Sequence, residues 1–268
     1  MNSFFVRGFM KTLIFDLDGT MYRDTSIIES AKRFLDYCIE KKIPFIFMTN
    51  NAMRTQKENA KHMLTMGYEG IEPWMFYNSA MASCQYVKSI SDKRKAYYIG
   101  RDGMKMALMD EGFLITEDKP DFVFVGLDKE CTYASYSKAL SFLLDGATLI
   151  GTNKDRVLVK QGGFEVGNGS VVALFEYASN QKSPDIAKPA YPILDLCMKH
   201  FHLKKEDIIL VGDNLETDIK LGYNHGIKTI FVQTGVHTEA DIERYHIVPT
   251  YTVNTLDELI DTQIVCCD

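Results

Sequence analysis

An apolar run leads directly into two carboxylates and a glycine in the stretch Leu13-Ile14-Phe15-Asp16-Leu17-Asp18-Gly19-Thr20. Side chains alternate along a strand, so Asp16 and Asp18 face the same side where this strand ends. Like charges this close raise each other's pKa, and a bound divalent cation such as Mg²⁺ would relieve that repulsion. Gly19 lets the backbone turn sharply there. A turn rich in Asp is the alternative, but we predict that Asp16 is a nucleophile.

Apolar stretches of strand and helix character alternate along the rest of the chain, which is typical of a parallel α/β sheet. The predicted strands are 12–15, 44–48, 96–99, 122–125, 148–150, 208–211, 229–232 and 250–253. The predicted helices are 30–41, 55–66, 80–88, 103–110, 133–144, 170–178, 190–201, 216–224 and 256–260.

The loops that carry the candidate motifs lie on both sides of residues 80–183. The simplest organisation is therefore a core made of residues 1–79 and 184–268, with residues 80–183 inserted as a second α/β domain. The polar stretch Asn180-Gln181-Lys182-Ser183-Pro184 resembles a linker at its end.

Composition excludes several classes of protein. The 268 residues are 46% hydrophobic and 25% charged, which is ordinary for a globular protein, and the net charge of −6 argues against a nucleic-acid binder. No apolar stretch approaches the ~18–20 residues that span a membrane. The six cysteines form no C-x-x-C motif, and without a secretory signal the predicted location is the cytoplasm. Residues 1–9 are predicted to be an extension, and Cys266-Cys267 does not form a prenylation box.

Two further motifs suit anion binding. Thr49 and Asn50 follow the second apolar strand, where a hydroxyl, an amide and backbone N–H groups can donate to phosphate oxygens. An ordinary helix N-cap is the alternative for this pair. Lys188-Pro189 lies just before a predicted helix, so Lys188 can direct a charge at an anion near the helix start. A simply solvated lysine is the alternative there.

The last motif, Gly212-Asp213-Asn214-Leu215-Glu216-Thr217-Asp218, again follows an apolar strand. A glycine and a carboxylate at a buried strand end suit a metal site, which points to Asp213. Asp218 falls on the first turn of the next helix and is predicted to orient Lys188 or a metal-bound water. Helix capping is the alternative for both carboxylates.

In this order, the four motifs resemble those of the haloacid dehalogenase-like (HAD) superfamily: D-x-D-G-T at Asp16, a threonine at Thr49, Lys-Pro at Lys188, and G-D-x-x-x-x-D from Gly212. The run TNNAMRT, which contains Asn51, and the run TNKD, which contains Asn153 and Asp155, look like elements of the NagD/4-nitrophenylphosphatase branch. The resemblance implies a Rossmann-like parallel-sheet core and a large inserted α/β cap, which matches residues 80–183.

The resemblance also implies a mechanism, which is hydrolysis of a phosphomonoester through an aspartyl-phosphate. Asp16 would attack phosphorus, and Asp18 would act as acid and then as base. Mg²⁺ would be held by the carboxylates of Asp16 and Asp213 and by the backbone carbonyl of Asp18. The phosphoryl charge would be balanced by the remaining motif residues, which are Gly19, Thr49, Asn50, Asn51 and Lys188.

The substrate is predicted to be a small phosphorylated metabolite, such as a nucleotide or a sugar phosphate, and the cap is expected to select it. Asn153, Asp155 and the stretch 160–165 are the candidate cap contacts. The resemblance further implies a homodimer formed through the cap. Two alternatives stay open: a phosphomutase, and a non-catalytic phosphate-binding regulator on the same fold.

Overall fold

The computed structural model describes residues 11–160, 162–262 and 264. The predicted extension 1–9 and the pair Cys266 and Cys267 lie outside these residues. Contacts divide the chain into two compact units, one of residues up to 48, 63–71 and from 201 onward, and the other of residues 49–62 and 72–200. These units follow contacts alone, so the domain boundaries at 80 and 183 remain a prediction.

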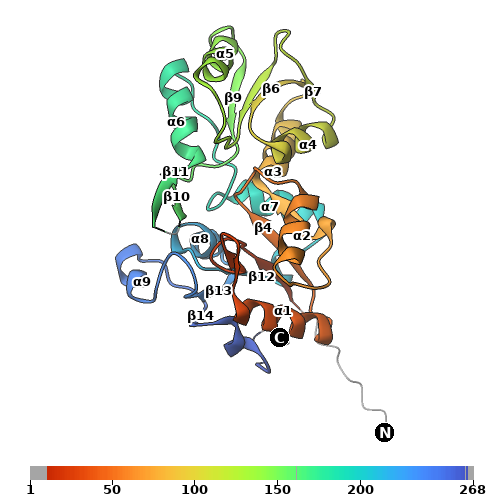
Figure 1. Ribbon diagram of the computed structural model, residues 1–268, viewed down its shortest axis with the longest axis vertical. Helices are drawn as coiled ribbons and strands as arrows, with labels where there is room; N and C mark the ends of the chain where they lie inside the picture. Colours follow the sequence, from red (N-terminus) through yellow and green to blue (C-terminus); the bar gives the residue numbers. More distant parts are fainter. Residues whose placement is uncertain (1–10, 161, 263, 265–268) are drawn as a thin grey trace. The chain divides into compact units, whose positions relative to one another are not determined.

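Strands and helices alternate along the whole described chain (Figure 1). The strands are β1 Thr12–Phe15, β2 Tyr22–Arg23, β3 Ser26–Ile27, β4 Phe45–Thr49, β5 Phe76–Asn78, β6 Lys95–Ile99, β7 Leu114–Ile115, β8 Phe122–Val125, β9 Thr148–Gly151, β10 Val157–Lys160, β11 Gly163–Val166, β12 Ile208–Gly212, β13 Lys228–Val232 and β14 Tyr251–Val253. The α-helices are α1 Glu29–Lys41, α2 Gln56–Thr65, α3 Ser79–Ile90, α4 Asp102–Asp110, α5 Tyr133–Leu144, α6 Asn168–Ser179, α7 Tyr191–His200, α8 Lys220–His225 and α9 Ala240–Tyr245. Shorter turns are the 3-10 helices η1 Pro73–Met75, η2 Lys205–Asp207 and η4 Leu256–Leu259, and the π-helix η3 Leu215–Ile219.

The first unit is built on parallel strands in the order β14-β13-β12-β1-β4. All four residues of β1 are buried, as is typical of a central strand covered on both faces. Phe15 packs edge-on against Phe34 of α1, with ring centroids 6.1 Å apart, and against Phe45 of β4 at 6.2 Å. The buried residues of α1 include Ala31 and Leu35 at helical spacing. The aromatic cluster therefore fixes β1 between its neighbours.

The second unit contains a four-stranded parallel sheet in the order β7-β6-β8-β9. Alternation along β8 divides its side chains between two layers. Val123 and Val125 belong to a core cluster that includes Phe175 of α6 and Leu143 of α5, two helices that lie side by side in Figure 1. The alternate β8 residues, Phe122 and Phe124, contact the ring of Phe113 instead. Helices α5 and α6 therefore cover one face of this sheet, and Phe113, from the loop after α4, packs on the other.

The predicted strands are present with ends that shift by a few residues, and so are the predicted helices, except that 216–224 begins with the π-helix η3 and 256–260 forms the 3-10 helix η4. The mixed α/β fold with a parallel-sheet core is confirmed. The sequence did not predict β2, β3, β5, β7 or α9. It also did not predict the antiparallel hairpin β10–β11, whose second strand lies in a stretch with glycines at 162, 163, 167 and 169. Its described side chains are largely exposed, so its burial pattern is weak. The stretch 180–184 also differs from a free linker. Gln181 accepts from the Leu149 N–H at 3.0 Å, and Ser183 Oγ accepts from the Gly151 N–H at 2.7 Å.

None of the helices in the described part of the chain has the length and apolar character that a bilayer-spanning segment needs.

Candidate active site

The strand order of the first unit reverses direction between β1 and β12. From β1 the chain continues to β4 on one side, and it later returns to β12 on the other side. This reversal is a topological switch point, and open α/β sheets bind ligands at such a point, beyond the carboxyl ends of the strands. Phe15 pairs with Val211, so Asp16 and Asp213 leave the sheet side by side.

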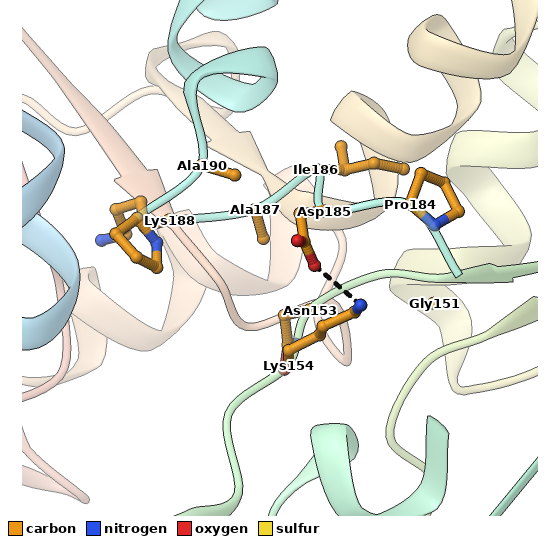
Figure 2. Close-up of a pocket in the computed structure, with 10 residues that line it drawn as sticks. Gly151, Asn153, Lys154, Pro184, Asp185, Ile186, Ala187, Lys188 and Ala190 are labelled. Carbon is orange, nitrogen blue, oxygen red and sulfur yellow. Dashed lines mark ion pairs between the residues drawn. The ribbon is translucent and has the colours of Figure 1, made fainter. Parts of the chain in front are cut away.

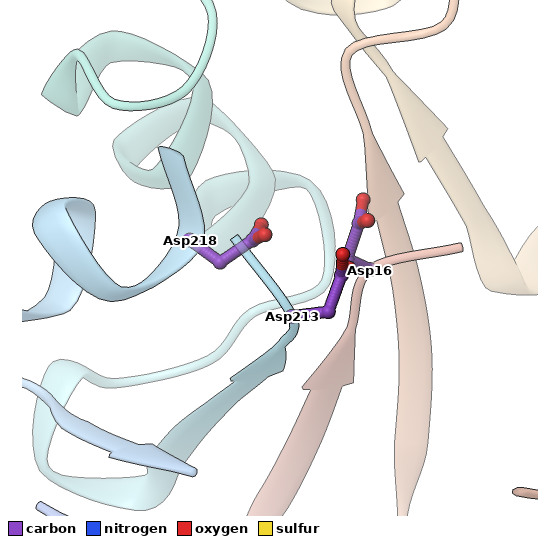
Figure 3. A group of neighbouring side chains, drawn as sticks. All are labelled: Asp16, Asp213 and Asp218. Atoms are coloured by element: carbon purple, nitrogen blue, oxygen red, sulfur yellow. The ribbon is translucent and has the colours of Figure 1, made fainter. Parts of the chain in front are cut away.

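Three carboxylates converge at this point. Asp16, Asp213 and Asp218 each offer an oxygen atom, and these atoms lie within 4.8 Å of one another. Figure 3 shows the three side chains coming from different segments toward one space. The sequence assigned Asp218 only a supporting role, whereas the structure brings its carboxylate into the same group as the other two.

The Asp213 carboxylate is buried and held on both oxygens. Asp213 is only 1% exposed. The Thr20 hydroxyl donates to Oδ1 at 2.9 Å, and the Val236 backbone N–H donates to Oδ2 at 2.7 Å. Burial, and then the charge of Asp218, raise the pKa of Asp213 to about 7. Two hydrogen bonds therefore do not compensate for the lost water and the neighbouring charge.

Three glycines allow the carboxylates to fit. A β-carbon at Gly19 or at Gly235 would overlap the Asp213 carboxylate, and one at Gly212 would overlap that of Asp218. Gly19 also has φ of +91°, a conformation that favours glycine. The positions around the cluster are therefore restricted to glycine by close contact with the carboxylates themselves.

The turn after β12 is a π-helix, η3, which is a geometry frequent at functional sites. The Asn214 side chain caps it by accepting from the Glu216 N–H at 2.9 Å. Because Asn214 fills the cap position, capping by Asp213 or Asp218 is not needed. His237 Nδ1 accepts from the Leu215 N–H at 3.1 Å, and burial lowers the pKa of His237, which favours the neutral imidazole that this bond requires.

The carboxylate cluster fits a hard divalent cation. It supplies only oxygen donors, which Mg²⁺ prefers, and the raised pKa of Asp213 indicates negative charge that the protein alone does not neutralise. Asp18 lies outside this group of three carboxylates, and it is exposed. Its backbone forms an isolated β-bridge with Tyr22.

The second unit holds the other predicted residues, with Asn50 at their centre. Asn50 Oδ1 accepts from the Lys188 N–H at 3.0 Å, and Asn50 Nδ2 donates to the Lys188 carbonyl at 3.0 Å. Nδ2 also lies 3.2 and 3.3 Å from the two carboxylate oxygens of Asp155. The Asn50 carbonyl accepts from Asn153 Nδ2 at 2.8 Å. Four predicted residues are thus joined in one network.

Thr49 and Asn51 stabilise the turn that follows β4. Thr49 Oγ1 accepts from the Asn51 N–H at 3.1 Å, and Asn51 Oδ1 accepts from the Met53 N–H at 3.0 Å. The N-terminus of α2 is capped elsewhere, because Thr55 Oγ1 accepts from the Glu58 N–H and Glu58 reciprocates. Helix capping therefore does not account for Thr49 and Asn50.

Lys188 is also not the solvated lysine of the simpler interpretation, because it is only 5% exposed. Lys188 is one of the residues that line a cavity of about 330 Å³ in the second unit. Lys154 and Asp185 line the same cavity, and Figure 2 shows the ion pair between them, whose N–O distance is 2.7 Å.

Two family models match the chain. A haloacid dehalogenase-like hydrolase model covers residues 13–114, and a HAD-hydrolase-like model covers residues 185–259. The chain is 35% identical to an acid sugar phosphatase of Staphylococcus aureus over 251 aligned residues. The aligned part is 93% of this chain and 96% of that protein. The chain belongs to the haloacid dehalogenase-like hydrolases.

Solved structures of this family agree with the predicted NagD/4-nitrophenylphosphatase branch. NagD from Escherichia coli K-12 matches with a TM-score of 0.85 and 31% identity over 93% of this chain and 98% of that chain. A 4-nitrophenylphosphatase from Thermotoga maritima matches with a TM-score of 0.87 and 30% identity over 94% and 97% of the two chains. The prediction of an enzyme of the phosphoric monoester hydrolase class is confirmed by these relatives.

Sequence reasoning missed the residues that build the walls of the site. Thr20, Gly235 and Val236 hold or closely contact Asp213, and Thr234 Oγ1 donates to the Gly19 carbonyl at 2.8 Å. Thr20 is part of the D-x-D-G-T motif but was given no role, and a sequence signal was also available for the other three. Residues 234–236 follow the apolar strand β13 and include a glycine, which is the same pattern that identified Gly212 and Asp213.

Proposed function

We propose that this hydrolase is a Mg²⁺-dependent phosphatase that cleaves small phosphomonoesters, sugar phosphates among them, through an aspartyl-phosphate. The observation that carries the proposal is the convergence of Asp16, Asp213 and Asp218 at the switch point of the sheet. Similarity to acid sugar phosphatases over 93% of the chain supports the substrate class.

Asp16 is the proposed nucleophile. It follows the last residue of β1, and its backbone N–H donates to the Val211 carbonyl at 2.8 Å, which anchors its position beside β12. In the proposed reaction a carboxylate oxygen of Asp16 attacks phosphorus, and the bond from phosphorus to the leaving oxygen breaks.

Asp18 is the proposed general acid and base. It would protonate the leaving oxygen and then take a proton from the water that hydrolyses the aspartyl-phosphate. Its exposed side chain is compatible with proton exchange with solvent. The Asp18 carbonyl and the carboxylates of Asp16 and Asp213 are the proposed cation ligands, and the position of Asp218 adds it to this set.

The cation would supply charge compensation for the phosphoryl oxygens and for the crowded carboxylates. Further compensation is the role we propose for Lys188, for Thr49, and for the backbone around Gly19, Asn50 and Asn51. The burial of Lys188 supports this role, because a buried ammonium group interacts more strongly with an anion than a solvated one.

A panel of phosphate esters tests the proposal. We expect the purified chain to hydrolyse 4-nitrophenyl phosphate and to rank sugar phosphates, nucleotides and other small esters by kcat/KM. EDTA should abolish the activity, and added Mg²⁺ should restore it. Asp16→Asn should lower kcat by roughly 10³-fold or more while the circular dichroism spectrum is unchanged.

Each part of the proposal has its own contrary result. Full activity in EDTA would contradict the role of the cation, and near-normal activity of Asp16→Asn would contradict the nucleophile. Binding of esters without turnover would favour a regulator, and phosphate transfer between two sugar positions would favour a mutase.

A further inference from the structure

The polar side chains of the run Thr152-Asn153-Lys154-Asp155, in the second unit, form hydrogen bonds with other residues of the protein. Asn153 is only 6% exposed, and both ends of its amide are used. Its Nδ2 donates to the Asn50 carbonyl at 2.8 Å, and its Oδ1 accepts from the Asp155 N–H at 3.2 Å. Asn153 is thus occupied in joining the loop after β9 to the residue after β4.

Asn50 has no spare side-chain hydrogen in this arrangement. The Nδ2 atom carries two hydrogens, and the structure gives it two acceptor groups, the Lys188 carbonyl and the Asp155 carboxylate. The Oδ1 atom accepts from the Lys188 N–H. The amide therefore pairs with the Lys188 backbone in both directions, and the charged Asp155 holds the amide in the orientation that this pairing requires.

The loop is itself anchored from the opposite side. Asn168, which is 1% exposed and begins α6, donates from Nδ2 toward Thr152 Oγ1 at 3.1 Å and the Asn153 carbonyl at 3.3 Å. The same atom lies 3.0 Å from the Val125 carbonyl at the end of β8. The network therefore runs from the sheet of the second unit through a buried chain of amides to Lys188. Asn168 Oδ1 is buried without a hydrogen-bond partner among the described residues. The amide oxygen and nitrogen of both Asn50 and Asn153 are hydrogen-bonded, and buried polar groups that are satisfied in this way fix one geometry.

We propose that Asp155 and Asn153 are positioning residues that fix Asn50 and, through it, the backbone of Lys188, rather than residues that contact the substrate. The inference deepens the proposed function and rests on it for the role of Lys188. It replaces the expectation that these two residues select the substrate. It predicts that their loss lowers the rate of the chemical step and leaves the affinity for the ester nearly unchanged.

Three variants test the proposal with 4-nitrophenyl phosphate. Asp155→Ala removes the acceptor for Asn50, and we expect kcat to fall by ~10–100-fold while KM stays within about twofold. Asp155→Asn keeps an oxygen that can accept from Asn50, so its kcat should stay within about threefold of the unaltered enzyme. Asp185→Ala is the matched control. It removes a nearby carboxylate that forms an ion pair with Lys154, and Lys154 still has its ion pair with Glu176 and its hydrogen bond to the Ser183 carbonyl.

A rise of about tenfold in KM with unchanged kcat would overturn the proposal, since it indicates substrate contact. Unchanged kcat and KM in Asp155→Ala would also overturn it. If Asp155→Ala does not fold, Asn153→Ala serves instead, because it removes the donor to the Asn50 carbonyl and should show the same selective loss of kcat.

Hydrogen exchange gives a readout that does not depend on turnover. In Asp155→Ala we expect the peptide covering residues 186–190 to exchange about tenfold faster, because the Lys188 N–H loses a fixed acceptor, while peptides from β12 are unchanged. Equal exchange in both proteins would contradict the positioning role. If the enzyme hydrolyses no ester, the proposed function fails, and this exchange experiment still decides between the two outcomes for the network.

Discussion

Replacing Asp213 by asparagine should stabilise the metal-free protein. The pKa of Asp213 rises from its ordinary value of 3.8 to about 7, because the group is buried and lies beside Asp218. One pKa unit corresponds to about 1.4 kcal/mol, so ionised Asp213 costs about 4 kcal/mol of folding free energy at pH 7 and above. A neutral amide avoids this cost.

Asparagine also fits the local hydrogen bonds. Its oxygen can accept from the Val236 N–H, as Oδ2 does now at 2.7 Å, and its NH₂ group can donate to the Thr20 hydroxyl, which now donates to Oδ1 at 2.9 Å. Allowing for weaker bonds to an uncharged group, we expect Asp213→Asn to gain about 2–4 kcal/mol in EDTA at pH 7.5. This corresponds to an increase of roughly 4–16 °C in the unfolding midpoint.

The sign of the pH dependence follows from the direction of the shift. The folded pKa of Asp213 lies above the unfolded one, so the folded state keeps a proton that the unfolded state has already lost. The stability of the metal-free protein therefore falls as pH rises from about 4 to about 7. Asp213→Asn should lack this decrease, and the gain from the substitution should disappear near pH 4.

Thermal unfolding with and without Mg²⁺ measures both effects. At a cation concentration about 100 times its dissociation constant, the unaltered protein should gain about 2.7 kcal/mol, and Asp213→Asn should gain almost nothing. Asp145→Asn, which changes an exposed carboxylate after α5, should behave like the unaltered protein. A less stable Asp213→Asn in EDTA, or one that Mg²⁺ stabilises fully, would refute the reasoning.

Two further substitutions test the walls of the site. Gly235→Ala places a β-carbon on the Asp213 carboxylate, so kcat should fall by about 100-fold or more. Asp145→Asn, which changes an exposed carboxylate after α5, should stay near normal in the same assay. Thr20→Val removes the donor to Asp213 and should raise the Mg²⁺ concentration for half-maximal activity by about 10–100-fold, and an unchanged Mg²⁺ titration would show that this hydroxyl does not orient the ligand.

The local sequence pattern predicted the two strand ends that carry the carboxylates. A buried strand followed at once by a carboxylate, with a glycine close by, leaves few alternatives, and both β1 and β12 have this pattern. Parallel pairing of neighbouring strands then brings Asp16 and Asp213 together without further information. The fold class followed from the same alternation of apolar strands and helices.

The polar network around Asn50 could not be predicted in this way. Asn50 and Asp155 are separated by 105 positions, and Asn50 and Lys188 by 138. Spacing along a strand or helix carries no information about such pairs, so each residue appeared only as a candidate for contact with the substrate. Asp218 was underestimated for a local reason, because a regular helical turn was expected where the chain forms the π-helix η3.

The energetic cost of the carboxylate cluster argues for a cation more strongly than its shape does. Exposed acidic groups gather on protein surfaces without binding metal, but Asp213 is only 1% exposed and faces two other carboxylates. Asparagine would satisfy Val236 and Thr20 without that cost, so hydrogen bonding alone does not explain a carboxylate there. A bound cation does explain it, because a cation that neutralises the cluster removes this cost in folding free energy. The free energy recovered in this way contributes to the affinity for the cation.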